Sequence, residues 1–303
     1  MSWATEISDA ADRIRPHIVQ TPLLDTPALA DLPVSLKLEQ LQHTGSFKAR
    51  GAFNTLLSHP VPEAGIVAAS GGNHGAAVAF AARKLGYRAT IFVPEIAGPA
   101  KIAQIRSTGA DLTVVPGVYA NALEQARAFE ARTGAMQIHA YDAPATVAGQ
   151  GSCFAEWDAQ GLDADTVLIA VGGGGLLAGA LAWWQGRRNV IAVEPENACA
   201  LHAAQQLGAP TDVEVSGVAA NALGARRIGQ IAFDLATDTP SVLVTDTAIT
   251  QAQKRLWQQH RLLVEPAGAA ALSALTSGAY RPAAGERVAV LICGGNLATD
   301  PLA

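Results

Sequence analysis

The chain has 303 residues and a mass of 31.2 kDa, which suits one large α/β unit or two smaller ones. Half of its residues are hydrophobic and 16% are charged, which excludes a disordered chain. The net charge of −5 argues against a general nucleic-acid binder. Neither a secretory signal nor an apolar run long enough to cross a bilayer is present, so we expect a cytoplasmic protein without membrane or nucleic-acid partners.

Short apolar runs alternate with longer, alanine-rich stretches along the chain. The runs predict strands at 65–69, 89–93, 112–115, 166–171, 190–193, 242–244 and 287–292. The stretches between them predict helices at 75–85, 100–107, 119–132, 175–185 and 248–260. This alternation implies a largely parallel sheet, and the unbroken apolar character of the strands implies burial on both faces.

Two proline-containing segments, at 59–62 and 142–144, are candidate linkers. The block between them has the size of a domain, so one unit is inserted into another. We predict a small α/β domain at 57–144 inserted into a larger domain formed by 1–56 and 145–303. In open α/β folds the site lies at the carboxyl ends of the strands, so the loops after the strands are the places to search for chemistry.

A glycine-rich turn, Gly172–Gly175, follows one predicted strand and precedes a helix that begins near Leu176. Glycines allow backbone N–H groups to approach a ligand closely, and a helix N-terminus favours a phosphate. The turn lacks the Lys-Ser/Thr ending of a nucleotide-binding P-loop. A phosphorylated cofactor and a plain tight turn are equally consistent with this segment alone.

Lys48 differs from the other four lysines of the chain. Lys84, Lys101 and Lys254 occupy polar helix faces, where we expect solvated side chains, whereas Lys48 follows Phe47 among small residues before a helix. An enclosed lysine loses its proton more easily and forms Schiff bases. A lone lysine in this context is more often on the surface. Combined with a phosphate-binding turn, however, it favours an aldehyde-bearing phosphate cofactor, and pyridoxal 5′-phosphate (PLP) satisfies both demands.

Two further loops carry polar groups where strands end. The loop 70–75 offers backbone N–H groups, a hydroxyl, the Asn73 amide and the His74 imidazole at a helix N-terminus, which suits a carboxylate. His74 has an alternative reading as a packing or capping residue. Cys293 ends the last apolar strand, where it is either inert packing or a neutral partner for a ring nitrogen.

These segments, together and in this order, resemble the serine/threonine dehydratases and serine racemases, which are fold-type II PLP enzymes. The matching segments are 46–52, 70–75, 172–175 and 293–296, supported by 149–152 and 265–270, within a resemblance that spans about 21–296. The resemblance implies two open, twisted, mostly parallel α/β lobes with the cofactor in the cleft between them. It also implies that the larger domain binds the cofactor and that the protein is a homodimer.

The resemblance assigns a role to each matching position. Lys48 would hold PLP as a Schiff base and act as the base at the substrate Cα, and Phe47 would pack beside the ring. Asn73 would hydrogen-bond the phenolic oxygen, and Cys293 would face the pyridine nitrogen. The phosphate would be bound by Gly172, Gly173, Gly174, Gly175 and Leu176. The substrate carboxylate would be lined by Ser70, Gly72, Asn73 and His74.

The expected activity is dehydration of a 3-hydroxy amino acid such as L-threonine or L-serine to a 2-oxo acid and ammonia. A racemase needs an acid/base group on the second cofactor face, which the racemases supply as a serine where this chain has Gly71. Racemisation is therefore the alternative, and so is 3-hydroxyaspartate dehydration, for which Arg226 and Arg227 would bind the second carboxylate unless they form a solvated surface pair. The segment around Lys48 does not match the lysine segment of the β-replacing synthases, which argues against that activity. A non-catalytic binding protein would not need Lys48, which is present.

The racemase-like members bind a divalent cation through a glutamate, a carbonyl four residues later and an aspartate two further. Glu194 and Ala198 match, but Ala200 stands at the aspartate position. Loss of one carboxylate weakens a divalent site, so we predict no tight metal and retain Glu194 and Ala198 only as weak candidates. Only ten residues follow Cys293, so we expect no C-terminal regulatory domain and a catabolic role.

Overall fold

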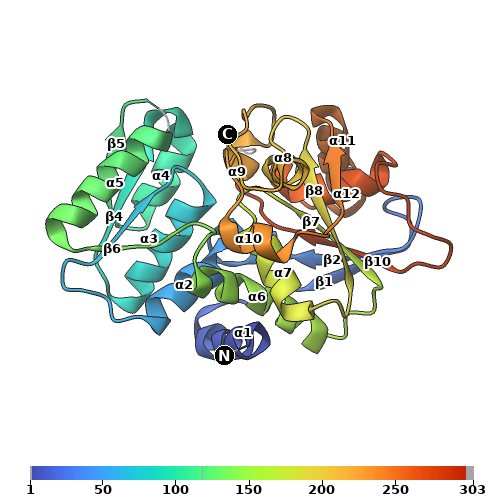
Figure 1. Cartoon of the computed structure of the whole chain (residues 1–303), viewed down its shortest axis with the longest axis horizontal. Helices are drawn as coiled ribbons and strands as arrows, with labels where there is room; N and C mark the ends of the chain where they lie inside the picture. The colour runs from blue at the N-terminus through green and yellow to red at the C-terminus, as the bar shows by residue number, and fades with distance from the viewer. Residues whose placement is uncertain (1, 118, 298–303) are drawn as a thin grey trace.

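The computed structural model describes residues 2–117 and 119–297. Two sheets lie side by side along the long axis of the molecule (Figure 1). The larger sheet has the strand order β1 (Leu23–Thr26), β2 (Val34–Leu38), β10 (Val288–Ile292), β7 (Thr166–Ala170), β8 (Asn189–Pro195) and β9 (Ser241–Val244). Only β1 and β2 pair in antiparallel fashion, and the other neighbours are parallel. The expected mostly parallel α/β architecture is confirmed.

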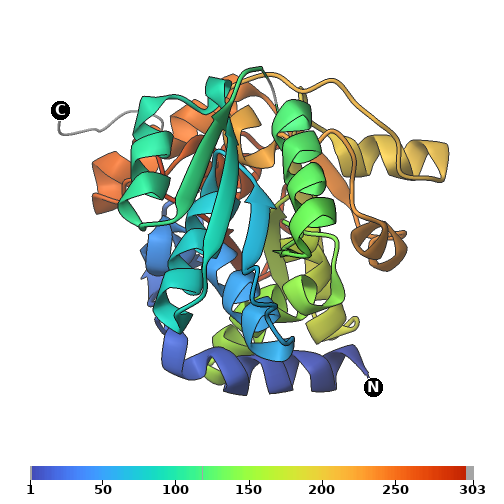
Figure 2. The same cartoon turned by 90° about the vertical axis from the view of Figure 1, so that its left-hand side faces the viewer.

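The smaller sheet is entirely parallel, with the order β5 (Asp111–Val115), β4 (Ala89–Pro94), β3 (Ile66–Ala69) and β6 (Met136–Gln137). Successive residues of β3 pack into two different apolar clusters. Ile66 and Ala68 join the cluster that contains α3 (Asn73–Leu85), and Val67 and Ala69 join the one that contains α5 (Tyr119–Thr133). Because side chains alternate between the faces of a strand, these two helices cover opposite faces (Figures 1 and 2).

Helices enclose the larger sheet as well. α12 (Pro266–Thr276) packs against β10, β7 and β8, with α11 (Asp246–His260) beside it. α7 (Gly175–Trp184) packs on β7 and β8 and contacts α6 (Pro144–Ala159), which in turn contacts α1 (Trp3–Ile14) and α2 (Lys48–Ser58). Every residue of β7 and β10 is buried, as their unbroken apolar character predicts. The remaining helices are α4 (Pro99–Ser107), α8 (Ala200–Leu207), α9 (Ala220–Leu223) and α10 (Gln230–Leu235).

The predicted strands and helices are present, with shifts of a few residues at their ends. The sequence predicts that the second strand stops before Pro94, yet β4 includes this residue. Proline fits here because β3 ends opposite Phe92, so Pro94 extends beyond β3. On that side no neighbouring strand requires a hydrogen bond from the backbone nitrogen of Pro94. The division at 57–144 remains a prediction, although the smaller sheet lies within those bounds. Among the described residues no helix is long and apolar enough to cross a membrane.

A buried ionic cluster joins α2 to α6 and to the end of β2. The Arg50 guanidinium, fully buried, donates to both carboxylate oxygens of Glu39 at 2.8 and 2.7 Å and to those of Glu156 on α6 at 3.1 and 2.9 Å. Lys37 on β2 donates to Glu156 at 2.5 Å. Burial pushes the pKa of Glu39 upward, but Arg50 outweighs it and the net pKa is lowered. The side chains of the cluster are therefore charged, and their ion pairs hold the first turn of α2 in place.

We expect Arg50→Met to lower the free energy of unfolding by about 3–5 kcal/mol, because it leaves the buried carboxylate of Glu39 without its main partner and removes one of the two cations bound to Glu156. Urea denaturation followed by circular dichroism measures this. Arg15→Met is the matched control, since Arg15 pairs with Asp12 at a site where its side chain is 77% exposed. Equal effects of the two substitutions would contradict the assignment.

Candidate active site

Lys48 is the first residue of α2. Its Nζ donates to the carbonyl oxygen of Ala140 at 2.8 Å and lies 5.1 Å from the centroid of the Phe47 ring. Ala140 belongs to the segment that leads from β6 back to α6. Burial lowers the pKa of Lys48 to about 8, so much of this amine is uncharged in mildly basic solution.

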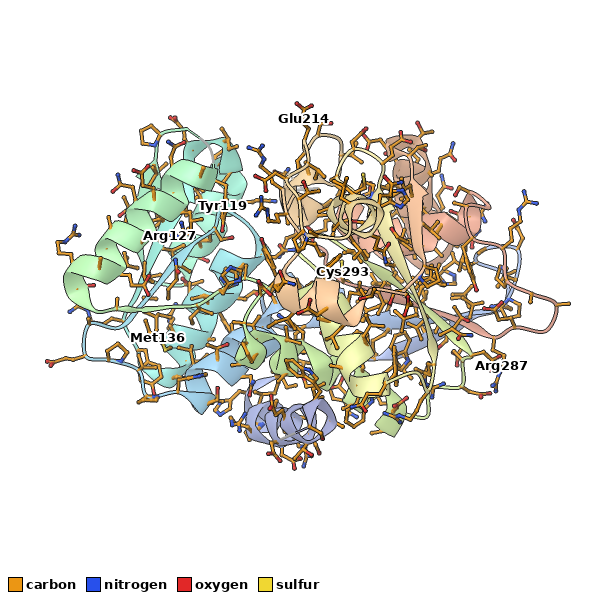
Figure 3. The ribbon with its side chains drawn as sticks, viewed as in Figure 1. Tyr119, Arg127, Met136, Glu214, Arg287 and Cys293 are labelled. Carbon is orange, nitrogen blue, oxygen red and sulfur yellow. The ribbon has the colours of Figure 1, made fainter. Side chains whose placement is uncertain are left out.

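The segment before Lys48 runs along the end of β10. The Phe47 N–H donates to the Cys293 carbonyl at 3.2 Å, and Ser46 forms an isolated bridge with Gly294. The Cys293 thiol is buried and donates to the Ala267 carbonyl at 3.4 Å. Burial raises its pKa strongly, so it is a neutral thiol. Figure 3 shows Cys293 near the middle of the molecule.

Asn73, at the start of α3, is held by groups from the other sheet. Its Nδ2 donates to Glu265 Oε1 at 2.5 Å, and its Oδ1 accepts from Asn296 Nδ2 at 2.9 Å. These two bonds fix the orientation of the amide and leave one Nδ2 hydrogen without a protein acceptor among the described residues. That hydrogen suits the phenolic oxygen that Asn73 is expected to bind.

The glycine turn after β7 is a cradle that larger residues would fill. A Cβ on Gly173 would lie 2.3 Å from the Tyr141 ring, and one on Gly174, which has φ 89°, would lie 2.4 Å from Ala232 Cβ. Across the described part of the chain, the backbone N–H groups of residues 172–176 donate to no protein acceptor. Free N–H groups at the N-terminus of α7 are the donors that a phosphate needs. These residues fit the phosphate of PLP.

The other predicted site residues lie close by, with partners of their own. The Ser70 hydroxyl accepts from the Gly72 N–H at 3.2 Å, within its own loop. The buried His74 ring pairs its Nε2 with the Ile138 carbonyl at 2.9 Å. Burial and the charge of Lys48 lower the pKa of His74 to about 3, so the ring is neutral. His74 thus packs between α3 and the segment after β6, and its contact with a substrate stays a prediction.

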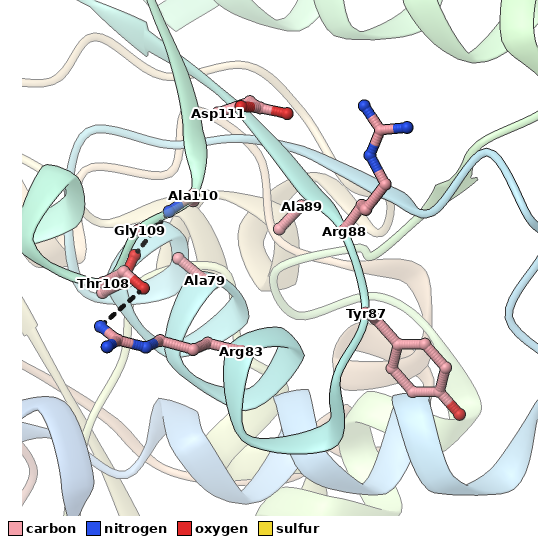
Figure 4. Close-up of a pocket in the computed structure, with 9 residues that line it drawn as sticks. All are labelled: Ala79, Arg83, Tyr87, Arg88, Ala89, Thr108, Gly109, Ala110 and Asp111. Atoms are coloured by element: carbon pink, nitrogen blue, oxygen red, sulfur yellow. Dashed lines mark hydrogen bonds between the residues drawn. The ribbon is translucent and has the colours of Figure 1, made fainter.

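These loops share one position in the fold. The segments of Ser70, Ala140, Gly172 and Cys293 follow the carboxyl ends of β3, β6, β7 and β10. A separate hollow of about 600 Å³, lined by Arg83, Thr108 and Asp111 among others, lies at the opposite, amino ends of β4 and β5 (Figure 4). It contains none of the predicted site residues. The candidate site is therefore the carboxyl-end cluster around Lys48.

Several neighbours of the site were not assigned from the sequence. Glu265 and Asn296 lie within matching segments, but the resemblance gives them no role, and Tyr141 lies outside those segments. Lys101 corrects a prediction: it was expected on a solvated face, but its side chain is only 5% exposed, because α4 packs on α3. Arg227 instead pairs with Asp212 at 2.7 Å on an exposed surface, the solvated alternative.

The geometry around Glu194 does not suit a divalent cation. Its carboxylate accepts from the N–H groups of Leu201 and His202 at the start of α8, at 2.8 and 2.9 Å, and from the Ser241 hydroxyl at 2.9 Å. No cluster of three or more His, Cys, Asp or Glu residues with the arrangement of a metal site occurs in the described ranges. In this chain, hydrogen-bond donors occupy the oxygens that a cation would need.

We expect Gly174→Ala to raise the dissociation constant of PLP by about tenfold or more, roughly 1.4 kcal/mol, because the new methyl group displaces the cradle. Titration of the apoprotein with PLP, followed by absorbance, measures this. Gly186→Ala is the control: its φ of 81° imposes the same backbone penalty, but nothing lies within 4 Å of the added Cβ. Equal weakening by both variants would contradict a phosphate cradle.

We expect prolonged treatment with a metal chelator, followed by gel filtration, to leave the rate of amino-acid breakdown unchanged, because Glu194 is already satisfied by protein donors. The measurement is the initial rate before and after treatment at saturating PLP. A loss of rate that Mg²⁺ or Ca²⁺ restores would overturn this prediction.

Comparison with known proteins places the chain in a family. The family model described as "Pyridoxal-phosphate dependent enzyme" matches residues 14–294. Phenylserine dehydratase of Ralstonia pickettii is 34% identical over 94% of this chain and 90% of its own length, and an L-threonine ammonia-lyase of Geobacter sulfurreducens is 34% identical over 97% and 75%. The structure of maize serine racemase superposes with a TM-score of 0.92, at 27% identity over 98% of this chain and 94% of its own. The chain belongs to the family of pyridoxal-phosphate dependent enzymes.

Proposed function

We propose that this enzyme is a PLP-dependent dehydratase that converts a 3-hydroxy amino acid such as L-threonine or L-serine to a 2-oxo acid and ammonia. The observation that carries the proposal is the packing at Gly71. The names of the two relatives, a dehydratase and an ammonia-lyase, support the same class of reaction. The reaction breaks the Cα–H and Cβ–O bonds, releases water, and then releases ammonia by hydrolysis.

Bound PLP supplies the acidity of the substrate Cα–H and accepts its electrons. Lys48 would hold the cofactor and remove that proton, since burial keeps its amine easily deprotonated. Phe47 would pack beside the cofactor ring, and residues 172–176 would anchor the phosphate through their N–H groups. Asn73 would bind the phenolic oxygen through its remaining Nδ2 hydrogen. The substrate carboxylate would be bound at the loop of Ser70, Gly72, Asn73 and His74.

The environment of Cys293 favours elimination. A neutral thiol that donates to the Ala267 carbonyl places no negative charge in the position that would face the pyridine nitrogen. A thiol at this position would not hold the ring nitrogen of bound PLP protonated, and the cofactor would then be a weaker electron acceptor. Such an environment would favour loss of the β-hydroxyl over transamination.

Racemisation is the second candidate, favoured by the close superposition with maize serine racemase. It needs a proton donor on the second face, at the place of Gly71. A Cβ on Gly71 would lie 2.3 Å from Ala97 Cβ and 3.2 Å from Val93 Cγ1. The adjacent Ser70 hydroxyl is turned into its own loop. Neither position presents an acid/base side chain, so dehydration is the better-supported reaction.

Two expectations about the whole protein belong to this proposal. We infer a cytoplasmic location, in keeping with a small-molecule substrate and with the absence of a candidate membrane helix among the described residues. We also infer a homodimer, which light scattering on the purified holoenzyme would test. Neither inference bears on the chemistry at Lys48.

We expect the holoenzyme to convert L-threonine or L-serine to equal amounts of 2-oxo acid and ammonia, with the D-isomer as a minor product. L-threo-3-hydroxyaspartate is the third substrate, and the ranking of the three identifies the preferred one. Each quenched sample is split between an oxo-acid assay and chiral chromatography. Lys48→Ala should lower kcat by about 100-fold or more, because the base is removed.

Lys84→Ala is the control for that substitution, since Lys84 is an exposed lysine on α3. A dominant D-isomer would contradict the argument from Gly71. A Lys48→Ala variant that keeps its rate would contradict the role of Lys48.

A further inference from the structure

Lys101 is a buried lysine beside the site. It lies on α4, and its side chain is 5% exposed, whereas Lys84 and Lys254 are exposed. Among the described residues it has no hydrogen-bond or ion-pair partner. Burial lowers its pKa, and the charge of Glu265 acts in the opposite direction. A lysine held in this way needs a functional or structural reason, because burying an unpaired ammonium is unfavourable.

The packing of α4 shows which way Lys101 faces. Ile105 lies one turn after Lys101, so the two side chains share a face of the helix. Ile105 Cδ1 packs 3.2 Å from the position of a Cβ on Gly75, and Ala97, just before α4, packs against Gly71. The face that carries Lys101 therefore lies along the loop 70–75, which the proposed function assigns to the substrate carboxylate.

A buried carboxylate lies on the other side of this loop. Glu265 is 2% exposed and accepts from Asn73 at 2.5 Å, but no ion pair joins it to Lys101 in the described part of the chain. Burial raises the pKa of Glu265 to about 7, and the charge of Lys101 counteracts this rise. Each group therefore affects the ionisation of the other, although no hydrogen bond or ion pair joins them among the described residues.

We propose that Lys101 is a second functional lysine, which binds the α-carboxylate of the amino-acid substrate at the loop 70–75. This rests on the proposed function in one respect, the binding of an amino acid beside Lys48. A substrate carboxylate that enters here would be repelled by Glu265, and in a poorly hydrated site that repulsion is costly. Backbone N–H groups at the start of α3 offset part of it. The ammonium of Lys101 supplies the full positive charge that an anion requires.

The test compares two amines that cannot be dehydrated, glycine with a carboxylate and ethylamine without one. Binding of each to the holoenzyme is followed by the change in cofactor absorbance, which does not depend on turnover. We expect Lys101→Met to raise the dissociation constant of glycine by tenfold or more and to change that of ethylamine by less than twofold. Lys101→Arg should recover most of the glycine affinity, since it keeps the charge. With a dehydrated substrate, KM should rise more than kcat falls.

Lys84→Met is the matched control and should change neither amine. Thermal unfolding of each variant shows whether the fold is kept, and Lys101→Gln provides a second neutral variant if the methionine variant unfolds. If glycine and ethylamine weaken by the same factor, or if neither changes, the proposal is wrong and Lys101 is only a structural partner of Glu265. Selective loss of glycine would support the proposal even if the preferred reaction were not dehydration.

Discussion

The site depends on the ion pairs that the Arg50 guanidinium forms with Glu39 and Glu156. This guanidinium is fully buried and bound to both carboxylates, so the first turn of α2 cannot shift without exposing charge to an apolar interior. Lys48 lies two residues earlier in that turn. The position of the backbone that carries the reactive amine is thus set by an electrostatic constraint outside the site, and the amine itself is oriented by the Ala140 carbonyl.

Around that fixed point, the parallel strands bring their carboxyl ends together. A parallel sheet places all its loops of one kind at one edge, and here hydrogen bonds of Lys48 with Ala140 and of Asn73 with Glu265 link such loops of the two sheets. The chain uses this arrangement to combine unlike groups: free N–H donors after β7, a neutral thiol after β10, and an oriented amide after β3. None of these three groups carries a full charge. Near the loop 70–75, Glu265 accepts from Asn73, and the further ionisable group proposed to act there is Lys101.

The sequence predicted the features that depend on local pattern. About ten residues of sequence are enough to recognise the apolar runs of β7 and β10, the glycine turn and the lysine after Phe47. The burial of Lys101 was not recognisable in this way, because a lysine on a helix is usually exposed and its burial here arises from the packing of α4 against another element. The partners of Asn73 were equally hidden, since Glu265 and Asn296 lie 192 and 223 residues away in sequence. Such contacts can be predicted only once the topology is known.

The hydrogen bond between Lys48 and Ala140 has a consequence of its own. Ala140 lies on the return path from the smaller sheet, so this bond fastens that path to the start of α2. A ligand that binds the amine of Lys48 must first displace this hydrogen bond. Binding at Lys48 is therefore coupled to the mobility of the segment that contains Ala140. The same event that occupies the site also removes a contact that holds this segment to α2.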